Sequence, residues 1–148
     1  MIADIRTAAE AVGITAFITN SNEKIEVQLN RITSQADLPI MVVAWNLQAS
    51  ITFNDNGFLD NPIVNVSCLL MNKPDDSSKD EAERVSEEMY FLYLDFIQKL
   101  RDILSPKLRN YQGQPVTSVN CGLVPRYGLG KHSGVRGDFS MITAIKNC

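Results

Sequence analysis

A long amphipathic segment constrains what this chain can fold into more than any other part of its sequence. Between residues 82 and 104, apolar side chains recur every three or four positions, which is the period of an α-helix and spans about six turns. Because burying one large apolar side chain stabilises a fold by roughly 1.5–3 kcal/mol, this stripe must form a major part of the core. The stripe consists of Ala82, Val85, Met89, Leu92, Tyr93, Phe96, Leu100, Ile103 and Leu104.

Capping residues mark both ends of this helix. Ser78 and Glu81 form a capping box, in which the serine oxygen accepts a hydrogen bond from the backbone N–H of Glu81. Acidic residues crowd the first turns and basic residues lie near the end, as the helix dipole favours. Pro106 cannot continue a helix, so we predict one continuous helix over about residues 78–105.

Two further apolar residues of this helix, Phe91 and Leu94, lie outside the stripe. A second apolar strip needs its own cover. One cover is a short helix predicted over residues 3–12, which has helical apolar spacing and ends at Gly13. The other cover is a second subunit, which would make Phe91 and Leu94 partner-binding residues. We expect the N-terminal helix to provide the cover.

Much of the remaining chain is predicted to form β-strands, because apolar alternation or β-branched runs are bounded by turn residues. The first two strands are joined by a turn at residues 20–23, and we expect them to pair as a hairpin. We predict a single α+β domain over residues 1–148, in which the two helices pack on a mainly antiparallel sheet. The predicted strands are 14–19, 24–32, 38–45, 50–53, 62–71, 115–124 and 137–146.

A glycine-rich, basic segment, residues 125–137, connects the last two predicted strands. It is too long for a tight turn, so we expect an exposed, mobile loop that takes part in binding. It does not match a phosphate-binding loop, because Pro125 stands where the first glycine belongs and no helix follows. Its candidate partner-binding residues are Arg126, Tyr127, Lys131, His132 and Arg136.

Motifs of catalysis and of metal or cofactor binding are not found. The three cysteines are widely spaced without a CxxC pair, and His132 is the only histidine. Neither the GxSxG nor the HExxH motif occurs. We therefore expect reduced thiols, no metal, no cofactor and no enzymatic activity.

Composition and charge exclude several classes of partner. The chain is 45% hydrophobic and 21% charged, which is typical of a folded globular domain. Its net charge of −3 gives no general attraction to nucleic acid or to anionic membranes. It begins without a signal-peptide pattern, and its longest apolar run, residues 38–45, is too short to cross a bilayer. We expect a cytoplasmic protein without membrane or sequence-specific nucleic-acid partners.

The charges are nevertheless segregated along the chain. Seven acidic residues fall within residues 75–88, against two basic ones. From residue 101 to residue 136 the balance reverses, with six basic residues against Asp102. Such a subunit is suited to contacts in which the acidic part of one copy meets the basic part of another.

The order of the predicted elements resembles the tail terminator and tail-completion proteins of long-tailed bacteriophages and prophages. The resemblance rests on the strand beginning Leu38-Pro39-Ile40, on the strand Ile63 to Met71 that leads through residues 72–77 into the long helix, and on the closing segment from Gly134 to Ile142. It covers most of the chain as a pattern of elements.

This resemblance implies a structural role without catalysis. Members of that family assemble as rings, often hexameric, that cap the tail tube and join it to the head connector. For this chain it implies partners that are other copies of itself, a tail-tube protein and a head-connector protein. It also implies assembly in the cytoplasm and a final place in the virion tail. We expect the 125–137 segment to become ordered on docking, with its cations facing the acidic 75–88 region of a neighbour.

Two other functions remain open at this point. The first is a small-ligand-binding protein or enzyme that uses the 125–137 segment as a lid over a pocket with His132 and Cys121. The second is a protein-interaction module of a bacterial assembly unrelated to phages. A ring-sized oligomer separates the adaptor from the ligand-binding protein, and neighbouring genes for capsid or tail proteins separate it from the unrelated module.

Overall fold

A computed structural model defines the fold of most of the chain. It describes residues 2–19, 39–50, 52–53, 55–57, 62–75, 78–108, 113–127 and 132–143. The elements are α1 (Ile2–Ala11), β1 (Thr15–Thr19), β2 (Ile40–Ser50), β3 (Ile63–Asn72), α3 (Lys79–Leu104), the 3-10 turn η1 (Ser105–Lys107), β4 (Val116–Tyr127) and β5 (His132–Ile142).

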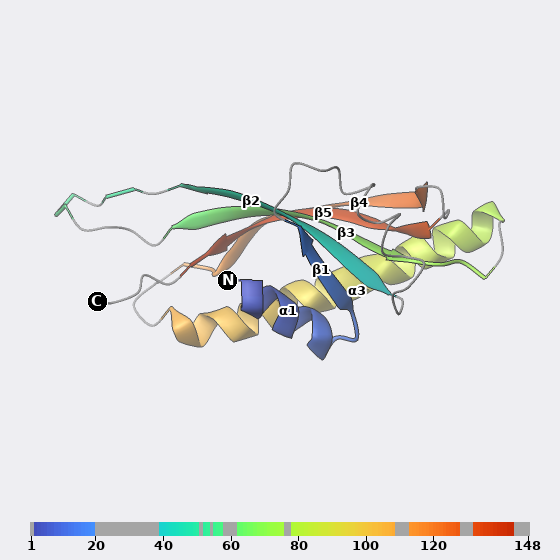
Figure 1. The fold of residues 1–148 in the computed structure, drawn as a ribbon, viewed down its shortest axis with the longest axis horizontal. Helices are drawn as coiled ribbons and strands as arrows, with labels where there is room; N and C mark the ends of the chain where they lie inside the picture. The colour runs from blue at the N-terminus through green and yellow to red at the C-terminus, as the bar shows by residue number, and fades with distance from the viewer. Residues whose placement is uncertain are drawn as a thin grey trace.

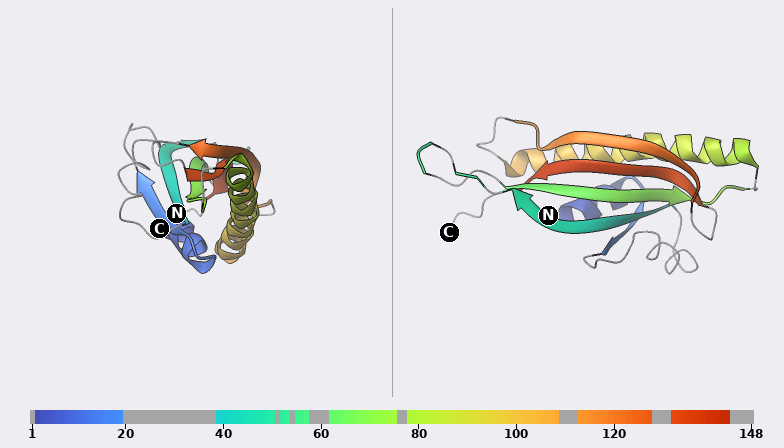
Figure 2. Two further views of the ribbon diagram at one scale, coloured as in Figure 1. Left: turned by 90° about the vertical axis from the view of Figure 1, so that its right-hand side faces the viewer. Right: turned by 90° about the horizontal axis from the view of Figure 1, so that it is seen from above.

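The strands form one five-stranded sheet in the order β1-β2-β3-β5-β4. β1 pairs with β2 in parallel, whereas the other three pairings are antiparallel. Both helices lie on the same face of this sheet, with α1 beneath β1 and α3 beneath β4 (Figures 1 and 2). The predicted α+β fold with a mainly antiparallel sheet is therefore confirmed.

The long helix α3 is organised as its sequence predicts. Its N-cap is Ser78, whose side chain accepts a hydrogen bond from the backbone N–H of Glu81. Glu81 in turn accepts from the backbone N–H of Asp75 at 3.5 Å. The apolar stripe is buried against the sheet, with the aromatic rings of Tyr93 and Phe96 fully enclosed. The side chain of Phe96 also meets the ring of Phe139 on β5 edge to face.

The short helix α1 confirms the prediction over residues 3–12 within one residue at each end. It ends at Gly13, whose φ of +82° is a backbone conformation that glycine adopts without a steric cost. Its Asp4 accepts a hydrogen bond from Lys107 in η1, which ties the start of α1 to the turn that follows α3. Ile5, Ala8 and Ala9 pack into the same core as α3.

The N-terminal half of the sheet differs from the prediction. Predicted strands 38–45 and 50–53 are largely one continuous strand, β2, with an irregularity between Trp45 and Ala49, and Phe53 forms only an isolated bridge. The predicted strand 24–32, and with it the proposed hairpin, lies outside the described residues. One edge of β1 pairs in parallel with β2, a long-range pairing that local sequence does not specify.

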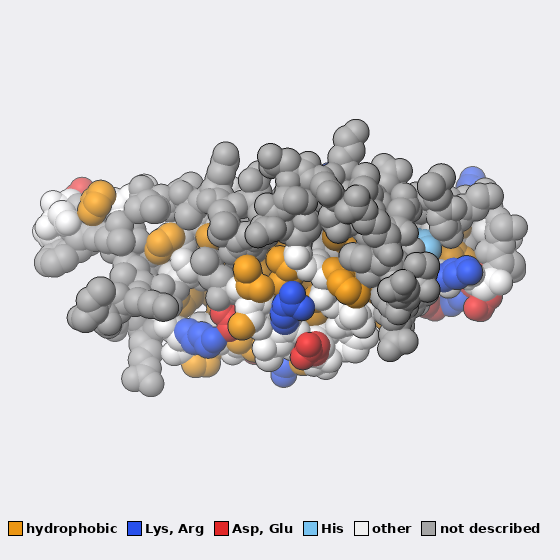
Figure 3. All heavy atoms as spheres, in the orientation of Figure 1, with side chains coloured by type: hydrophobic (Ala, Val, Ile, Leu, Met, Phe, Trp, Pro, Cys, Tyr) orange, Lys and Arg blue, Asp and Glu red, His pale blue; other side chains and the backbone are white. Residues whose placement is uncertain are grey.

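Beyond the ends of β2 and β3, the described residues 52–53 and 55–57 project from one end of the molecule (Figures 1 and 2). Phe53 in this projecting segment is 70% exposed. Figure 3 shows apolar atoms on the surface at this end of the molecule. Asp55-Asn56-Gly57 form a turn, in which Gly57 has a φ of +80° that glycine adopts without a steric cost.

The prediction of a mobile loop over residues 125–137 is wrong. β4 continues to Tyr127 and β5 begins at His132, so that most of this segment forms strand pairs. Gly134, within β5, serves close packing: a β-carbon there would lie 1.8 Å from the backbone oxygen of Leu70. At the other end, β5 stops at Ile142, before the predicted end at residue 146.

Candidate protein-binding surface

The edge strand β4 carries the most exposed apolar part of the described sheet. Its ladder with β5 is regular over Asn120–Val124 and shifts register on both sides of this stretch. The first shift is a bulge at which Ser118 has a φ of +53°. Because β4 is terminal among the strands that the structure describes, the outer edge of this stretch offers backbone N–H and C=O groups to another strand.

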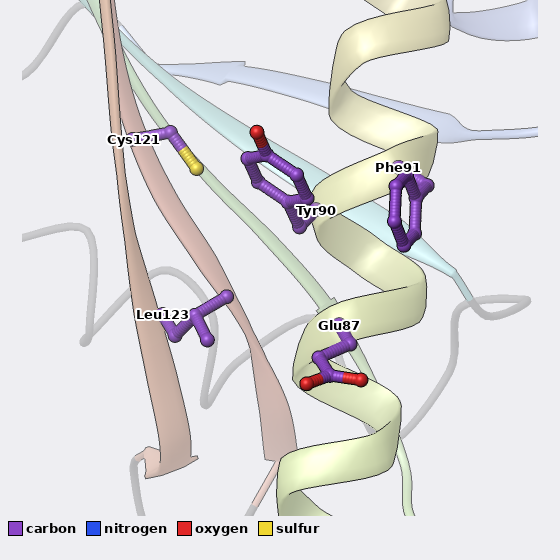
Figure 4. A pocket seen from close by; sticks show the side chains of 5 residues that line it. All are labelled: Glu87, Tyr90, Phe91, Cys121 and Leu123. Carbon is purple, nitrogen blue, oxygen red and sulfur yellow. The ribbon is translucent and has the colours of Figure 1, made fainter.

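A groove runs between β4 and α3 beside this edge. Cys121 and Leu123 point from the strand toward the helix, and Tyr90 points from the helix toward the strand (Figure 4). Glu87 and Phe91 complete the lining, and the groove encloses about 380 Å³. Its walls are mainly apolar, and Glu87 is the only charged side chain among the described residues that line it.

Large apolar side chains stand exposed around the groove. Phe91 is 63% exposed, Leu123 is 53% exposed and Leu94 is 40% exposed. The expectation that the N-terminal helix covers Phe91 and Leu94 is therefore wrong, because α1 lies beneath β1 on the other side of α3 (Figure 2). A contiguous exposed apolar area next to a free strand edge is a feature of protein-binding surfaces.

The groove side of α3 carries acidic residues in its first half and a basic residue near its end. Glu87 lines the groove, and Glu83 lies one helical turn before it in a weak ion pair with Lys79. Near the other end of the helix, the guanidinium of Arg101 donates a hydrogen bond to the side chain of Gln114, just before β4. The groove side of α3 is thus acidic in its first half and basic near its end.

Part of the acidic 75–88 region is compensated within the chain. The guanidinium of Arg84 pairs with Glu81 and Glu88 and lies 3.9 Å from Asp75. These exposed pairs steady the first turns of α3 and contribute little to overall stability. The predicted pairing of this region with cations of a neighbouring copy stays a prediction.

The thiol of Cys121 has none of the features of an activated nucleophile. Burial raises its pKa, so the thiol is protonated at neutral pH. Burial also raises the pKa of Cys68, on β3, to about 12. Both cysteines pair with Gly137 from opposite sides of β5, so that two strand spacings, about 9.6 Å, separate them. This separation is too large for a disulfide.

The predicted binding residues of the 125–137 segment do not line the groove. His132 is buried in β5 opposite Tyr127, where burial and the nearby charge of Lys73 lower its pKa. Arg136 is exposed on β5, opposite Gly122. Arg126 and Tyr127 belong to β4 by their backbone, but their side chains, and all of Lys131, lie outside what the structure describes.

Of the seven predicted binding residues, the structure therefore brings together Phe91 and Leu94. Sequence reasoning missed Tyr90, Cys121 and Leu123, which complete the surface. The alternation of Val119, Cys121 and Leu123 in a predicted strand was a usable signal, because one apolar face of an edge strand can remain open.

Comparisons with known proteins do not assign this chain to a family. A scan against known protein families matched none, and a search of curated proteins found no similar sequence. Within the described residues, no group of three or more His, Cys, Asp or Glu side chains is placed to hold a metal ion. No helix in the described part of the chain combines the length and apolarity needed to cross a membrane.

Proposed function

We propose that this chain is a structural adaptor that assembles with copies of itself and with other proteins, as phage tail terminator and tail-completion proteins do. In this role it forms a ring that caps the tail tube and joins it to the head connector. The observation that carries the proposal is the open strand edge of β4 beside the exposed Phe91, Leu94 and Leu123. Its assembly takes place in the cytoplasm, and its final place is the virion tail.

The character of this surface favours a protein partner over a small ligand. A small-molecule site is usually a concave pocket in which a few polar groups converge to orient the ligand. The groove between α3 and β4 is open and apolar, and it borders the outer edge of β4, which is terminal among the described strands and carries backbone groups that a partner strand can bind. A partner polypeptide can bury its apolar side chains in this groove and pair its backbone with β4.

The ends of the described sheet are also compatible with repeated contacts. β1 and β4 are its terminal strands, and they differ in length and in direction relative to their neighbours. Different surfaces at the two edges allow head-to-tail contacts, which close into a ring when the rotation between neighbours permits.

The ligand-binding alternative with a 125–137 lid has little support, since residues 125–127 and 132–137 belong to β4 and β5. His132 pairs with Tyr127, whereas Cys121 pairs with Gly137, so the two do not share the groove. An interaction module unrelated to phages would use the same surface, and neighbouring genes for capsid or tail proteins distinguish that case.

The test combines native mass spectrometry with negative-stain electron microscopy of the full chain, alone and mixed with a phage tail-tube protein from a neighbouring gene where one exists. We expect closed rings, and a stable complex of the ring with the tube. A chain that never grows beyond a dimer, and that does not bind the tube protein at micromolar concentrations, would contradict the proposed function.

A further inference from the structure

We infer that residues 20–38, which join β1 to β2, cross the face of the sheet opposite the helices and cover a group of apolar side chains there. The occupant of this face is thus a segment of the same chain. This part of the face belongs to the interior of the subunit, so partner proteins cannot use it. The inference does not depend on the proposed function, which rests on β4 and α3.

The helix-free face of the sheet carries an apolar cluster of its own. Its residues alternate along β2 and β3 with Met41 and Leu70, which point to the other face and into the core beneath the helices. The β2–β3 register places Ile40 opposite Met71 and Val42 opposite Leu69, so these four share one face. Phe17 and Val124 pack at the margin of this cluster.

The cluster is buried although both described helices lie on the other face (Figures 1 and 2). Three of its four members are 0% exposed, and Leu69 is 2% exposed. Further along the same face, Asn65 on β3 and Asp138 on β5 are exposed. The bare sheet thus leaves side chains open to solvent, so the cluster must be covered by a part of the chain outside the described residues.

Length and position identify residues 20–38 as the cover. This stretch holds 19 residues, whereas no other stretch outside the described residues is longer than five. It starts after Thr19 and ends before Pro39, next to the strands that carry Phe17 and Ile40 of the cluster. It must return along only about 13 Å of strand, so most of its length is free to spread over the face.

The handedness of the connection points to the same face. Parallel neighbours in a sheet are joined by crossovers, which are right-handed in about 98% of cases. The right-hand view of Figure 2 looks onto the helix-free face, where β2 points to the left with β3 above it and therefore β1 below it. Turned so that β1 and β2 point upward, β2 lies to the right of β1. A right-handed connection then passes in front of the sheet, across the cluster.

The sequence of the connection suits this position. Residues 24–32 alternate between apolar and polar side chains, as an extended segment with one buried face does. The apolar face can lie on the cluster while the polar face meets solvent. The apolar positions are Ile25, Val27 and Leu29, and the polar ones are Glu26, Gln28 and Asn30.

A hairpin between residues 24–32 and the outer edge of β1 would explain less. The amide of Thr15 donates to the carbonyl oxygen of Pro39 at 3.1 Å, so Ala16 and Ile18 present their backbone groups to the outer edge. There the guanidinium of Arg6, on α1, donates to the carbonyl oxygen of Ala16 at 3.4 Å. A side chain of α1 thus already uses this edge, and a strand placed there would leave the apolar cluster without a cover.

The first experiment is NMR of the full chain with labelled methyl groups. We expect nuclear Overhauser effects from Val27 and the apolar positions beside it to Val42 and Leu69. Contacts from residues 24–32 to the backbone of β1, without contacts to the cluster, would overturn the inference and establish the hairpin.

Hydrogen exchange in the same samples separates the two arrangements independently. The amides of Ala16 and Ile18 should exchange faster than the amide of Phe17, which points toward β2. Exchange at Ala16 and Ile18 as slow as at Phe17 would show that a strand pairs with the outer edge of β1, which contradicts the crossover.

The second experiment measures whether the cluster is covered in solution. In a Cys121→Ser, Cys148→Ser background, Leu69→Cys should react with a maleimide roughly tenfold or more slowly than Asn65→Cys. Both positions lie on the same face of β3, and the remaining Cys68 is buried. Equal reaction rates would overturn the inference.

The third experiment tests which face of the segment is buried. Val27→Asp should lower the folding equilibrium constant by roughly tenfold or more, because it buries a charge, whereas the control Gln28→Asp should change it less than about twofold. If the charged variant does not fold, Val27→Ala and Gln28→Ala provide the same comparison. Equal effects at the two positions would contradict the predicted cover.

Discussion

The ring of Tyr93 lies directly against Gly137, so that a β-carbon at residue 137 would come within 2.5 Å of it. This contact brings α3 close to the sheet at the level of Cys121, which pairs with Gly137. It thereby sets the distance between α3 and β4 in the groove, where Tyr90, one turn of α3 before Tyr93, faces the strand.

Gly137→Ala should therefore destabilise the fold by about 1–3 kcal/mol, because Tyr93 is fully enclosed and its ring has no free space to move into. Urea denaturation followed by circular dichroism measures the change. Gly122→Ala is the matched control, since a β-carbon there meets nothing within 4 Å. Both changes are best made in a Phe91→Glu background. A charge at this exposed position should prevent self-association from adding to the measured free energy of unfolding. Equal stabilities of the two alanine variants would contradict the close contact.

Tyr93→Phe should leave the stability unchanged or raise it by up to about 1 kcal/mol. The hydroxyl of Tyr93 is buried without a hydrogen-bond partner among the described residues, and burial raises its pKa. Removing a polar group without a partner also removes its desolvation cost. Thermal and urea denaturation measure the effect. A loss of more than about 1 kcal/mol would mean that the hydroxyl makes a hydrogen bond.

The free energy of unfolding should fall as the pH drops into the mildly acidic range, because His132 is buried. Burial, followed by the charge of Lys73, lowers its pKa below the ordinary value of 6.5. The unfolded chain thus binds this proton more tightly, so stability is retained above the ordinary pKa and falls as the pH drops below it.

This pH dependence can be isolated because His132 is the only histidine. Its folded-state pKa is measurable by NMR, and His132→Gln should reduce the loss of stability between about pH 7 and pH 5. A folded-state pKa at or above 6.5, or an unchanged pH profile in the variant, would contradict this account.

Lys107→Met should destabilise the fold by about 0.5–1 kcal/mol at neutral pH, a modest value because Lys107 is half-exposed and solvent screens its charge. Burial tends to raise the pKa of Asp4, but opposing effects, led by the hydrogen bond from Lys107, leave it lowered. The stabilisation is thus present above the ordinary pKa near 3.8 and is lost as the pH falls through the lower folded-state value. Urea denaturation at pH 7 and pH 3 tests this. If Lys107→Met lowered the free energy of unfolding as much at pH 3 as at pH 7, the ion pair with Asp4 would not explain its effect.

Local signals explain which parts of the fold were predictable. The period of α3 and its cap at Ser78 are encoded within a few residues of each other, and both predictions are confirmed. The parallel pairing of β1 with β2 depends on contacts between distant segments, so the sequence near β1 could not predict it.

The largest error came from the glycines of the 125–137 segment. Glycine has two roles, flexibility and close approach, and a sequence alone does not separate them. Gly134 faces the backbone of Leu70 and Gly137 faces Tyr93, so both serve close packing within β5. The candidate surface was half predictable: Phe91 and Leu94 lie outside the helical stripe, but the strand beside them could not be known without the sheet order.

Hydrogen exchange of the full chain over a range of concentrations tests most directly whether β4 and α3 form a protein-binding surface. We expect the outer-edge amides of Asn120–Val124 to exchange quickly in dilute protein and to become protected as the concentration rises. Phe91→Glu places a charge in this surface and should abolish the protection. Phe53→Glu changes an exposed phenylalanine outside the surface and should leave the protection in place. Fast exchange at every concentration, or protection that Phe91→Glu leaves unchanged, would contradict the account.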